Sequence, residues 1–199
     1  MMVILTMLAL LAGIFYGAGG FDLLPVSFLA EHTNGILYVL MLAVGISVGM
    51  QEGIFRKISQ YNIKIFIIPF GVILGSVLGG MLCSVVTGIP LNSAVAIGGG
   101  MGWYSLSGAA ISELAGAEMG SIAFLSNLMR EIFSFFLIPF LAVKLNNYSC
   151  IASAGATSED TTLPMMLKYT NEETVVLSVL NGMICSFFVP ILISLCFPG

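Results

Sequence analysis

The sequence predicts an all-α integral membrane protein with about five full spanning helices and two re-entrant or broken helical segments. Of its 199 residues, 58% are hydrophobic and only 8% are charged, and the mean hydropathy is +1.08. A soluble domain carries about 25% charged residues, so water cannot be the solvent for most of this surface. We expect one transmembrane domain over residues 1–199, since a spanning helix needs only roughly 20 residues.

Apolar runs, punctuated by Gly, Pro and charged residues, predict where the spanning helices lie. The expected spans are 3–18, 35–50, 65–86, 120–143 and 174–197. The loop after the second span contains Arg56 and Lys57, with Lys64 just beyond, and these are half of the six Lys and Arg residues. Cytoplasmic loops carry an excess of Lys and Arg, so this loop and the N-terminus are predicted to lie inside the cell.

Three glycines recur at every fourth residue of the third predicted span, at Gly71, Gly75 and Gly79. Small residues at this spacing let helix backbones approach closely in a membrane. We therefore expect this face of the span to pack against another helix.

The stretch GGGMGWYSLSGAAISE, residues 98–113, interrupts the apolar pattern. Irregular backbone at membrane depth is tolerated only where it is buried in protein or lines a watery cavity, and a substrate pathway is its usual purpose. Instead of lining a pathway, Trp103 and Tyr104 could anchor the chain at the membrane interface, and Glu113 could lie at the solvated end of a loop. The candidate substrate or ion ligands in this stretch are Gly102, Tyr104, Ser105, Ser107 and Glu113.

A second polar stretch, SAGATSEDTTLP, supplies Thr157, Ser158 and Asp160 as candidate ligands. Such residues satisfy free backbone N–H groups at turns and helix ends, which suits a hairpin tip; an ordinary cytoplasmic loop is the alternative. If Lys144 and Lys168 both face the cytoplasm, stretch 98–113 enters from the outer side and this second stretch from the inner side. Broken helices that cross the membrane remain the other possibility.

Two charged residues, Arg130 and Glu131, lie near the centre of the fourth predicted span. A charge at mid-depth costs at least about 2.5–3.5 kcal/mol on insertion scales, so it is rarely without a function. Neighbouring helical residues point about 100° apart, so these two are not expected to pair with each other. Asn127 shares a face with Glu131, so both are candidate ligands of a substrate or ion, and Arg130 is expected to position a carboxylate of the protein or of the substrate. A purely structural network is the alternative explanation.

The interior predicted in this way is rich in carboxylates and poor in bases, which favours a cationic substrate. Glu131, Asp160 and Glu113 could also take up protons, because burial disfavours the charged form of a carboxyl group. A group that binds either a proton or a cation provides a basis for antiport. An intramembrane serine hydrolase needs a His or Lys base at depth, and the single histidine, His32, lies in a predicted loop. We therefore predict no enzyme, no cofactor, no metal site and no nucleic-acid partner.

Several blocks of the chain resemble the bacterial L-lysine exporter family. They are GMGWYSLSG with Ser112-Glu113 after it, GSIAFLSNLMREI with IPFL, GATSEDTTLP and, more weakly, YVLMLAVGISVG. The resemblance implies a multi-pass protein of the bacterial inner membrane that exports L-lysine, and analogues such as thialysine, without hydrolysing ATP. Export of another cationic amino acid, ornithine or arginine, remains an alternative.

Typical members of this family are about 100 residues longer, so the chain resembles their C-terminal two-thirds. The missing N-terminal spans include a carboxylate in or near the pathway of the longer members, which no position here inherits. We therefore expect either a homodimer or a complex with a small membrane protein that supplies those helices. A structural membrane subunit of a two-component transporter is the alternative function.

Overall fold

The computed structural model describes residues 64–198, together with separate positions between residues 8 and 46. The chain divides into two compact units, Met1–Leu42 and Ala43–Gly199, and the account below concerns the second. The predicted spans 3–18 and 35–50 lie outside the described residues except at single positions, as does the loop with Arg56 and Lys57. One transporter domain over the whole chain stays a prediction.

Three long helices form the frame of the second unit: α5 (Lys64–Thr87), α8 (Ala117–Lys144) and α11 (Glu172–Cys196). They confirm the last three predicted spans within three residues at each end. Each is long and apolar enough to cross a membrane, and no other helix among the described residues is. The described part of the chain is helical and contains no strand, so the fold class is confirmed there, but the expected count of about five spans is not.

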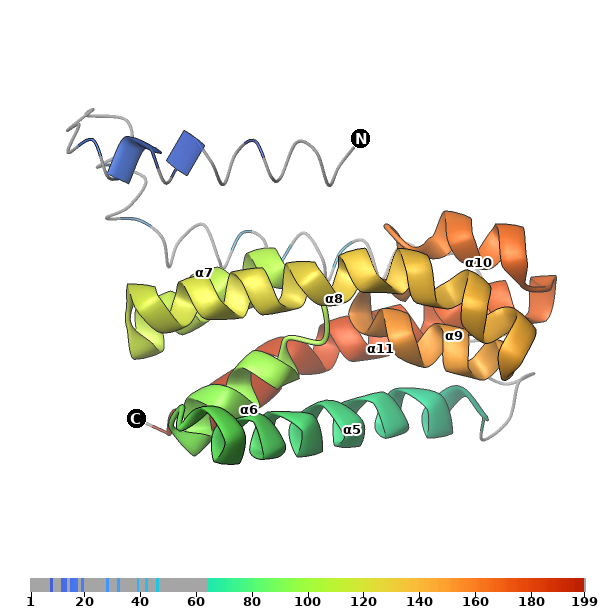
Figure 1. Ribbon diagram of the computed structural model, residues 1–199, viewed down its shortest axis with the longest axis horizontal. Coiled ribbons are helices and arrows are strands. Elements are labelled where there is room, and N and C mark those ends of the chain that lie inside the picture. Colours follow the sequence, from blue (N-terminus) through green and yellow to red (C-terminus); the bar gives the residue numbers. More distant parts are fainter. Residues whose placement is uncertain are drawn as a thin grey trace. The chain divides into compact units, whose positions relative to one another are not determined.

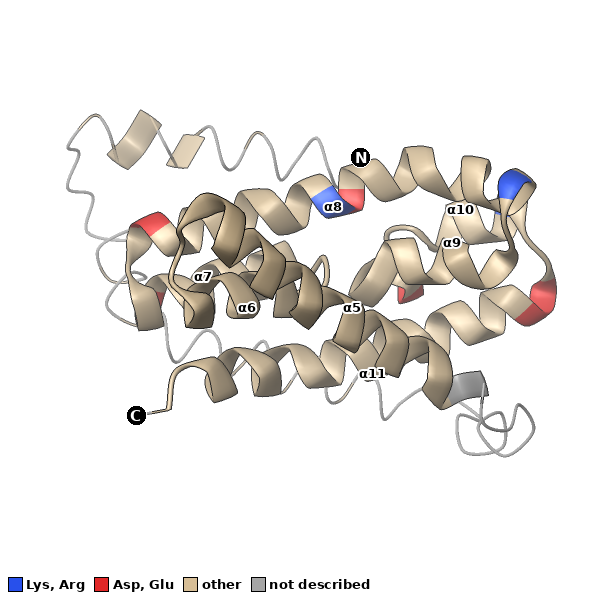
Figure 2. Ribbon diagram, turned by 60° about the horizontal axis from the view of Figure 1, so that its bottom comes forward, with Lys and Arg blue, Asp and Glu red and all other residues tan. Residues whose placement is uncertain are grey.

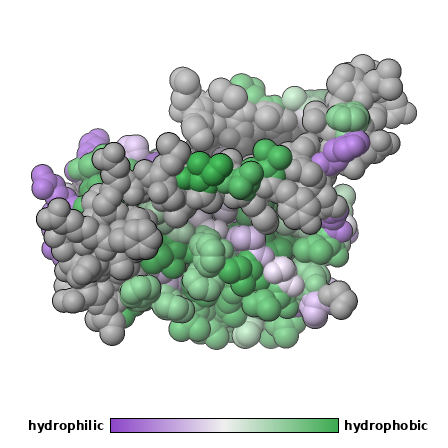
Figure 3. Space-filling view, turned by 180° about the vertical axis from the view of Figure 1, so that it is seen from behind, coloured by the Kyte–Doolittle hydropathy of each residue, from purple (hydrophilic) through white to green (hydrophobic). Residues whose placement is uncertain are grey.

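Large apolar side chains cover the outside of this frame, as expected for helices that face lipid. Figure 3 shows a mostly hydrophobic surface over the described residues of one face. The most exposed of these side chains on the three long helices are Leu82, Val85, Val86, Phe136, Val143 and Leu195.

Shorter helices fill the two connections between the long ones. The first connection contains α6 (Leu91–Gly99) and α7 (Tyr104–Ala115). The second contains α9 (Asn147–Ala154), the 3-10 helix η1 (Gly155–Glu159) and α10 (Leu163–Tyr169).

Each connection is a hairpin that turns back to the end of the bundle from which it started, and the two hairpins enter from opposite ends (Figure 1). A helix of nine residues is only about 14 Å long, so α6 reaches no further than the middle of a hydrocarbon core about 30 Å thick. This arrangement agrees with the re-entrant topology that the positions of Lys144 and Lys168 favour, and not with broken helices that cross.

Capping residues explain where the elements of the second hairpin begin. Asn146 accepts a hydrogen bond from the Ser149 N–H at 2.9 Å and starts α9. After the hairpin, Asn171 accepts one from the Thr174 N–H, also at 2.9 Å, and starts the long helix α11. Asparagine at these positions satisfies N–H groups that the first helical turn leaves free.

Close helix packing uses different glycines from those that the sequence pattern indicates. A Cβ atom on Gly98 would lie 2.5 Å from the Ser76 carbonyl oxygen, and one on Gly80 would lie 2.6 Å from the Ala94 carbonyl oxygen, so α5 and α6 touch backbone to backbone. In contrast, a Cβ on Gly71, Gly75 or Gly79 would meet nothing within 4 Å. The expectation of packing at these three positions is therefore wrong for the described residues, because their face of α5 borders a groove.

Candidate functional site

The candidate site lies around the middle of α8, where Arg130 and Glu131 are the fourteenth and fifteenth of 28 residues. Figure 2 shows that Lys, Arg, Asp and Glu otherwise gather toward the ends of the bundle, with one acidic group near the tip of the second hairpin. Within the described part of the chain, charge in the interior is therefore confined to α8 and to the hairpin beside it (Figure 2). The two tips reach this level: the first break is residues 100–103 and the second break is residues 155–162.

Asn127 holds the first break in place. Its side-chain oxygen accepts a hydrogen bond from the Gly102 N–H at 2.8 Å, and its amide nitrogen donates to the Ile97 carbonyl at 3.0 Å and to the Ala123 carbonyl at 2.9 Å. A broken helix leaves such backbone groups without helical partners, and leaving them unsatisfied in the interior is costly. Asn127 is predicted as a substrate ligand, but here its oxygen and one donor stabilise the break, and its other donor bonds within α8.

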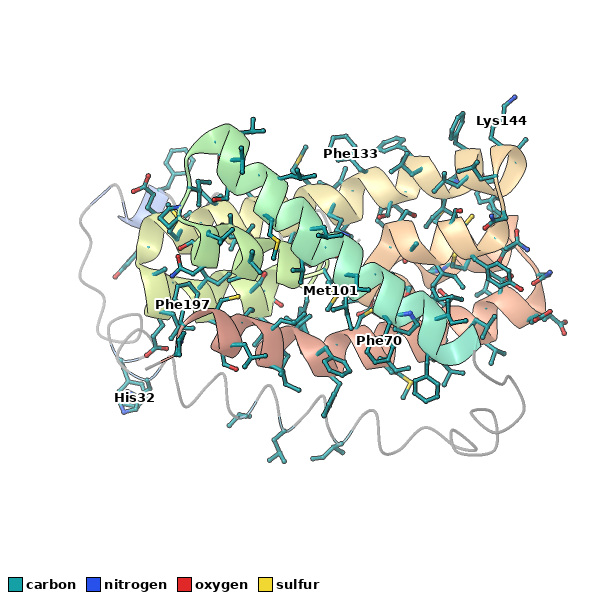
Figure 4. The ribbon with its side chains drawn as sticks, turned by 90° about the horizontal axis from the view of Figure 1, so that it is seen from below. His32, Phe70, Met101, Phe133, Lys144 and Phe197 are labelled. Atoms are coloured by element: carbon teal, nitrogen blue, oxygen red, sulfur yellow. The ribbon has the colours of Figure 1, made fainter. Side chains whose placement is uncertain are left out.

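The two breaks touch each other in the middle of the bundle. The Ala156 N–H donates a hydrogen bond to the Met101 carbonyl at 2.9 Å, and Figure 4 places Met101 between the ends marked by Lys144 and Phe197. Gly155 has a φ of +65°, and a Cβ there would overlap the Met101 carbonyl and lie 2.9 Å from the Arg130 guanidinium. Only glycine fits this contact, because any side chain would push the tips apart.

Arg130 reaches from α8 toward α5 and α9. It donates to the Ser76 hydroxyl at 2.9 Å and to the Ala152 carbonyl at 3.4 Å. Both acceptors are neutral, and no described carboxylate forms an ion pair with the guanidinium within 4 Å. As expected from the angle between them, Arg130 and Glu131 do not pair with each other.

Glu131 points toward the second hairpin and is 1% exposed. Among the described residues, neither of its carboxylate oxygens has a hydrogen-bond partner. Thr161 and Asp160 lie close enough to act on its charge, although no donor there has hydrogen-bond geometry. An unsatisfied carboxyl group is unfavourable in a dry interior unless it is protonated or holds a cation, so the environment of Glu131 favours one of these two states.

A polar stripe on α11 binds the second break, and the sequence interpretation did not identify it. Ser158 and Ser178 each donate a hydroxyl hydrogen bond to the other's carbonyl, at 2.8 and 2.7 Å. Asn181 donates to the Gly155 carbonyl at 2.9 Å and to the Ser158 hydroxyl at 3.0 Å. The spacing of Ser178 and Asn181, three residues apart on one helix face, could have indicated this stripe from the sequence.

Glu159 is a further carboxylate of the second break that the sequence interpretation did not list. Its carboxylate accepts a hydrogen bond from the Ser186 hydroxyl at 2.8 Å, and η1 packs against α11 at Gly182, where a Cβ would lie 2.5 Å from the Glu159 Cβ. Burial raises the pKa of Glu159 to about 7, while the bond from Ser186 opposes this shift and Asp160 adds to it. Asp160, the next residue, is exposed, and its carboxylate accepts a hydrogen bond from the Thr161 N–H.

The predicted ligands of the first hairpin divide into two groups. Gly102 lies at the contact between the breaks, where a Cβ would be 3.3 Å from the Thr157 methyl group. Ser107 is buried and donates to the Trp103 carbonyl at 2.8 Å, and the Tyr104 ring packs edge-on against Phe124. These bonds and contacts stabilise the start of α7.

Two other predicted residues of this hairpin point elsewhere. Ser105 and Glu113 are exposed. Glu113 is nine residues along α7 from Tyr104, which corresponds to about 14 Å, so it lies away from the breaks. In the second hairpin, the Thr157 hydroxyl donates to the Ala154 carbonyl at 2.9 Å.

A cavity of about 620 Å³ opens between α5, α6 and α8, beside Arg130. Within the described part of the chain, no three His, Cys, Asp or Glu side chains are grouped as metal ligands would be. The interior thus presents one guanidinium toward the cavity and carboxylates toward the second hairpin. Such an arrangement is suited to a ligand that carries both charges, or to a cation that is exchanged.

Comparison with known proteins gives consistent matches. A family model described as "Lysine exporter LysO" matches residues 7–197. The chain is 34% identical over 171 residues to "Lysine exporter LysO" of Escherichia coli (strain K12), which covers 84% of this chain and 56% of that protein. It is 33% identical over 158 residues to "Putative lysine exporter" of Haemophilus influenzae, covering 79% and 80%. It thus matches just over half the length of the Escherichia coli relative, and no solved structure matches it.

Proposed function

Because this chain belongs to the lysine exporter family, we propose that it exports L-lysine across the bacterial inner membrane in exchange for protons. The family is one of transporters and not of enzymes. Three helices suited to crossing a membrane support a membrane location. We extend the proposal to lysine analogues such as thialysine, whose charged groups are the same.

The observation that carries the proposal is the buried Glu131 carboxyl group, whose two oxygens have no hydrogen-bond partner among the described residues. Such a group is stable in the interior as the neutral acid or with a cation beside it. Release of a proton on one side of the membrane and binding of the lysine ammonium in its place would couple the two movements. Asp160, next to Glu131 and exposed, would pass cations to and from solvent.

The other predicted ligands have supporting roles in this proposal. The Met101–Ala156 contact keeps Gly102, Thr157 and Ser158 beside the carboxylates, and Asn127 holds the first break in register. Hairpin ends and unwound backbone at mid-depth are what transporters use to hold charged substrates. Tyr104, Ser105, Ser107 and Glu113 stay candidate ligands of lower priority.

The test is lysine efflux from cells that express Glu131→Gln, a variant of nearly the same shape that cannot ionise. We expect efflux to be abolished while the amount of protein in the membrane is unchanged. Glu118→Gln is the matched control, because Glu118 is exposed in the first turn of the same helix. Normal efflux by Glu131→Gln would remove Glu131 from the mechanism.

We further propose that this chain works as a homodimer or in a complex with a small membrane protein. A structural subunit of a two-component transporter is the alternative function. Affinity purification from native membranes should recover a second copy or a small membrane protein. Lysine transport by the purified monomer in liposomes would contradict both.

A further inference from the structure

The cavity beside Arg130 is a groove lined largely by small side chains. The α5 side of this α5–α8 groove contains Gly71, Gly75 and Gly79, at each of which a Cβ would meet nothing within 4 Å. The opposite wall includes Ile122 and Ser126 of α8. Its volume of about 620 Å³ lies in the range of small-molecule sites.

Arg130 brings a positive charge to this groove, and no carboxylate among the described residues pairs with it. Its guanidinium is always protonated and has five N–H donors. In the structure it donates to the Ser76 hydroxyl and to the Ala152 carbonyl. Neutral acceptors orient the group but do not balance its charge. Glu131, the next residue, points toward the second hairpin instead.

The remainder of the groove lining suits the apolar part of a ligand. Of the residues that the structure describes, no Asp, Glu, Lys or second Arg lines the groove, whose lining includes Val72, Ile97 and Ile122. A buried charge is stabilised by an opposite charge with good hydrogen bonds, and a planar guanidinium matches a carboxylate with two parallel bonds. The complementary ligand is therefore a carboxylate followed by an aliphatic chain.

We propose that Arg130 binds the α-carboxylate of the transported amino acid in the α5–α8 groove. The inference rests on the proposed export of lysine and names the part of lysine that is recognised there. Ser76 is the positioning residue, since its hydroxyl holds one nitrogen of the guanidinium. It follows that the transporter selects α-amino acids and rejects a diamine of the same length, which lacks the carboxylate.

The experiment measures binding of radiolabelled L-lysine to the purified protein, with unlabelled L-lysine, L-lysinamide and 1,5-diaminopentane as competitors. For the wild type we expect lysine to compete at least roughly tenfold better than either compound without a carboxylate, as a charge-assisted pair of hydrogen bonds implies. Arg130→Gln should weaken lysine binding by about the same factor and remove the preference over lysinamide.

A second pair of variants tests the groove without changing charge. Gly75→Leu should fill it, because a side chain there meets open space, and should weaken lysine binding while the protein stays folded. Val85→Leu is the matched control, at a position that is 84% exposed on the same helix and outside the groove lining. Ser76→Ala should weaken lysine binding less than Arg130→Gln does.

Equal binding of lysine and lysinamide by the wild type would overturn this proposal and leave lysine export intact. Unchanged lysine affinity in Gly75→Leu, with a changed oligomeric state, would also overturn it and assign the groove to a neighbouring helix. If the wild type bound no lysine at all, the proposed function would fail and this proposal with it.

Discussion

Replacing Gly155 with alanine should separate the two hairpin tips while leaving the long helices in place. Gly155 has a φ of +65°, where a side chain costs about 1–3 kcal/mol. Its new Cβ would overlap the Met101 carbonyl and lie 2.9 Å from the Arg130 guanidinium. Relief of this overlap moves the second break away, so the bond from the Ala156 N–H to Met101 is lost. Unsatisfied buried groups add about 1–3 kcal/mol.

Gly116→Ala is the matched control for the backbone strain alone. Gly116 has a φ of +88°, and a Cβ there would meet nothing within 4 Å. We expect Gly116→Ala to lower the free energy of unfolding by about 1–3 kcal/mol and Gly155→Ala to lower it by about 2–6 kcal/mol. Lysine efflux should fall in Gly155→Ala only.

The assay is unfolding of the purified protein by SDS titration in mild detergent micelles, with efflux measured in parallel. The result of interest is the difference between the two variants, about 1–3 kcal/mol. Equal destabilisation of both variants, with normal efflux in each, would refute the claim that the tip contact organises the site.

Two further predictions concern the polar groups that hold the breaks. Asn127→Ala should lower the free energy of unfolding by about 1–3 kcal/mol, because the buried Gly102 N–H loses its acceptor. Asn127→Asp keeps that acceptor and should preserve the bond to Gly102. An unchanged unfolding midpoint in Asn127→Ala would contradict the role of Asn127 in holding the first break. Glu159 has a pKa of about 7 against a usual 4.5, so the folded state binds more protons than the unfolded state in this window and stability falls as pH rises from about 4.5 to 7. Glu159→Gln should flatten this decline in stability, and Ser186→Ala should extend the decline to higher pH because the carboxylate loses its donor. An identical pH profile in the wild type and both variants would show that Glu159 does not titrate in this range.

The described helices could largely be predicted from the sequence because a bilayer restricts their length. Runs of apolar residues near 20 predict a span, and the bounds of α5, α8 and α11 follow from them. The two polar stretches were equally evident, since glycines, serines and threonines in an apolar chain indicate irregular backbone that must be buried in protein. The centre of α8 could be recognised as a candidate site on the same basis.

The contacts within the candidate site could not be predicted in the same way. Arg130 bonds to Ser76, 54 residues earlier, and such a pairing depends on which hairpin faces which helix. Gly71, Gly75 and Gly79 of α5 show most clearly what the sequence cannot predict, because glycines at this spacing are equally compatible with close helix packing and with an open groove. The role of Asn127 could not be predicted for a similar reason, since an amide at mid-depth can bind either a ligand or the free backbone groups of a broken helix.

The sequence by itself determined that this chain is a membrane protein with charge at the centre of one helix, because hydropathy and the cost of a buried charge are properties of the residues. Only the tertiary structure decided that the hairpin tips meet, that Arg130 and Glu131 serve different sides of α8, and that Glu159 joins the carboxylates. The physical reason is that these features depend on contacts between segments far apart in the chain, whose register is set by backbone packing at Gly98, Gly155 and Gly182.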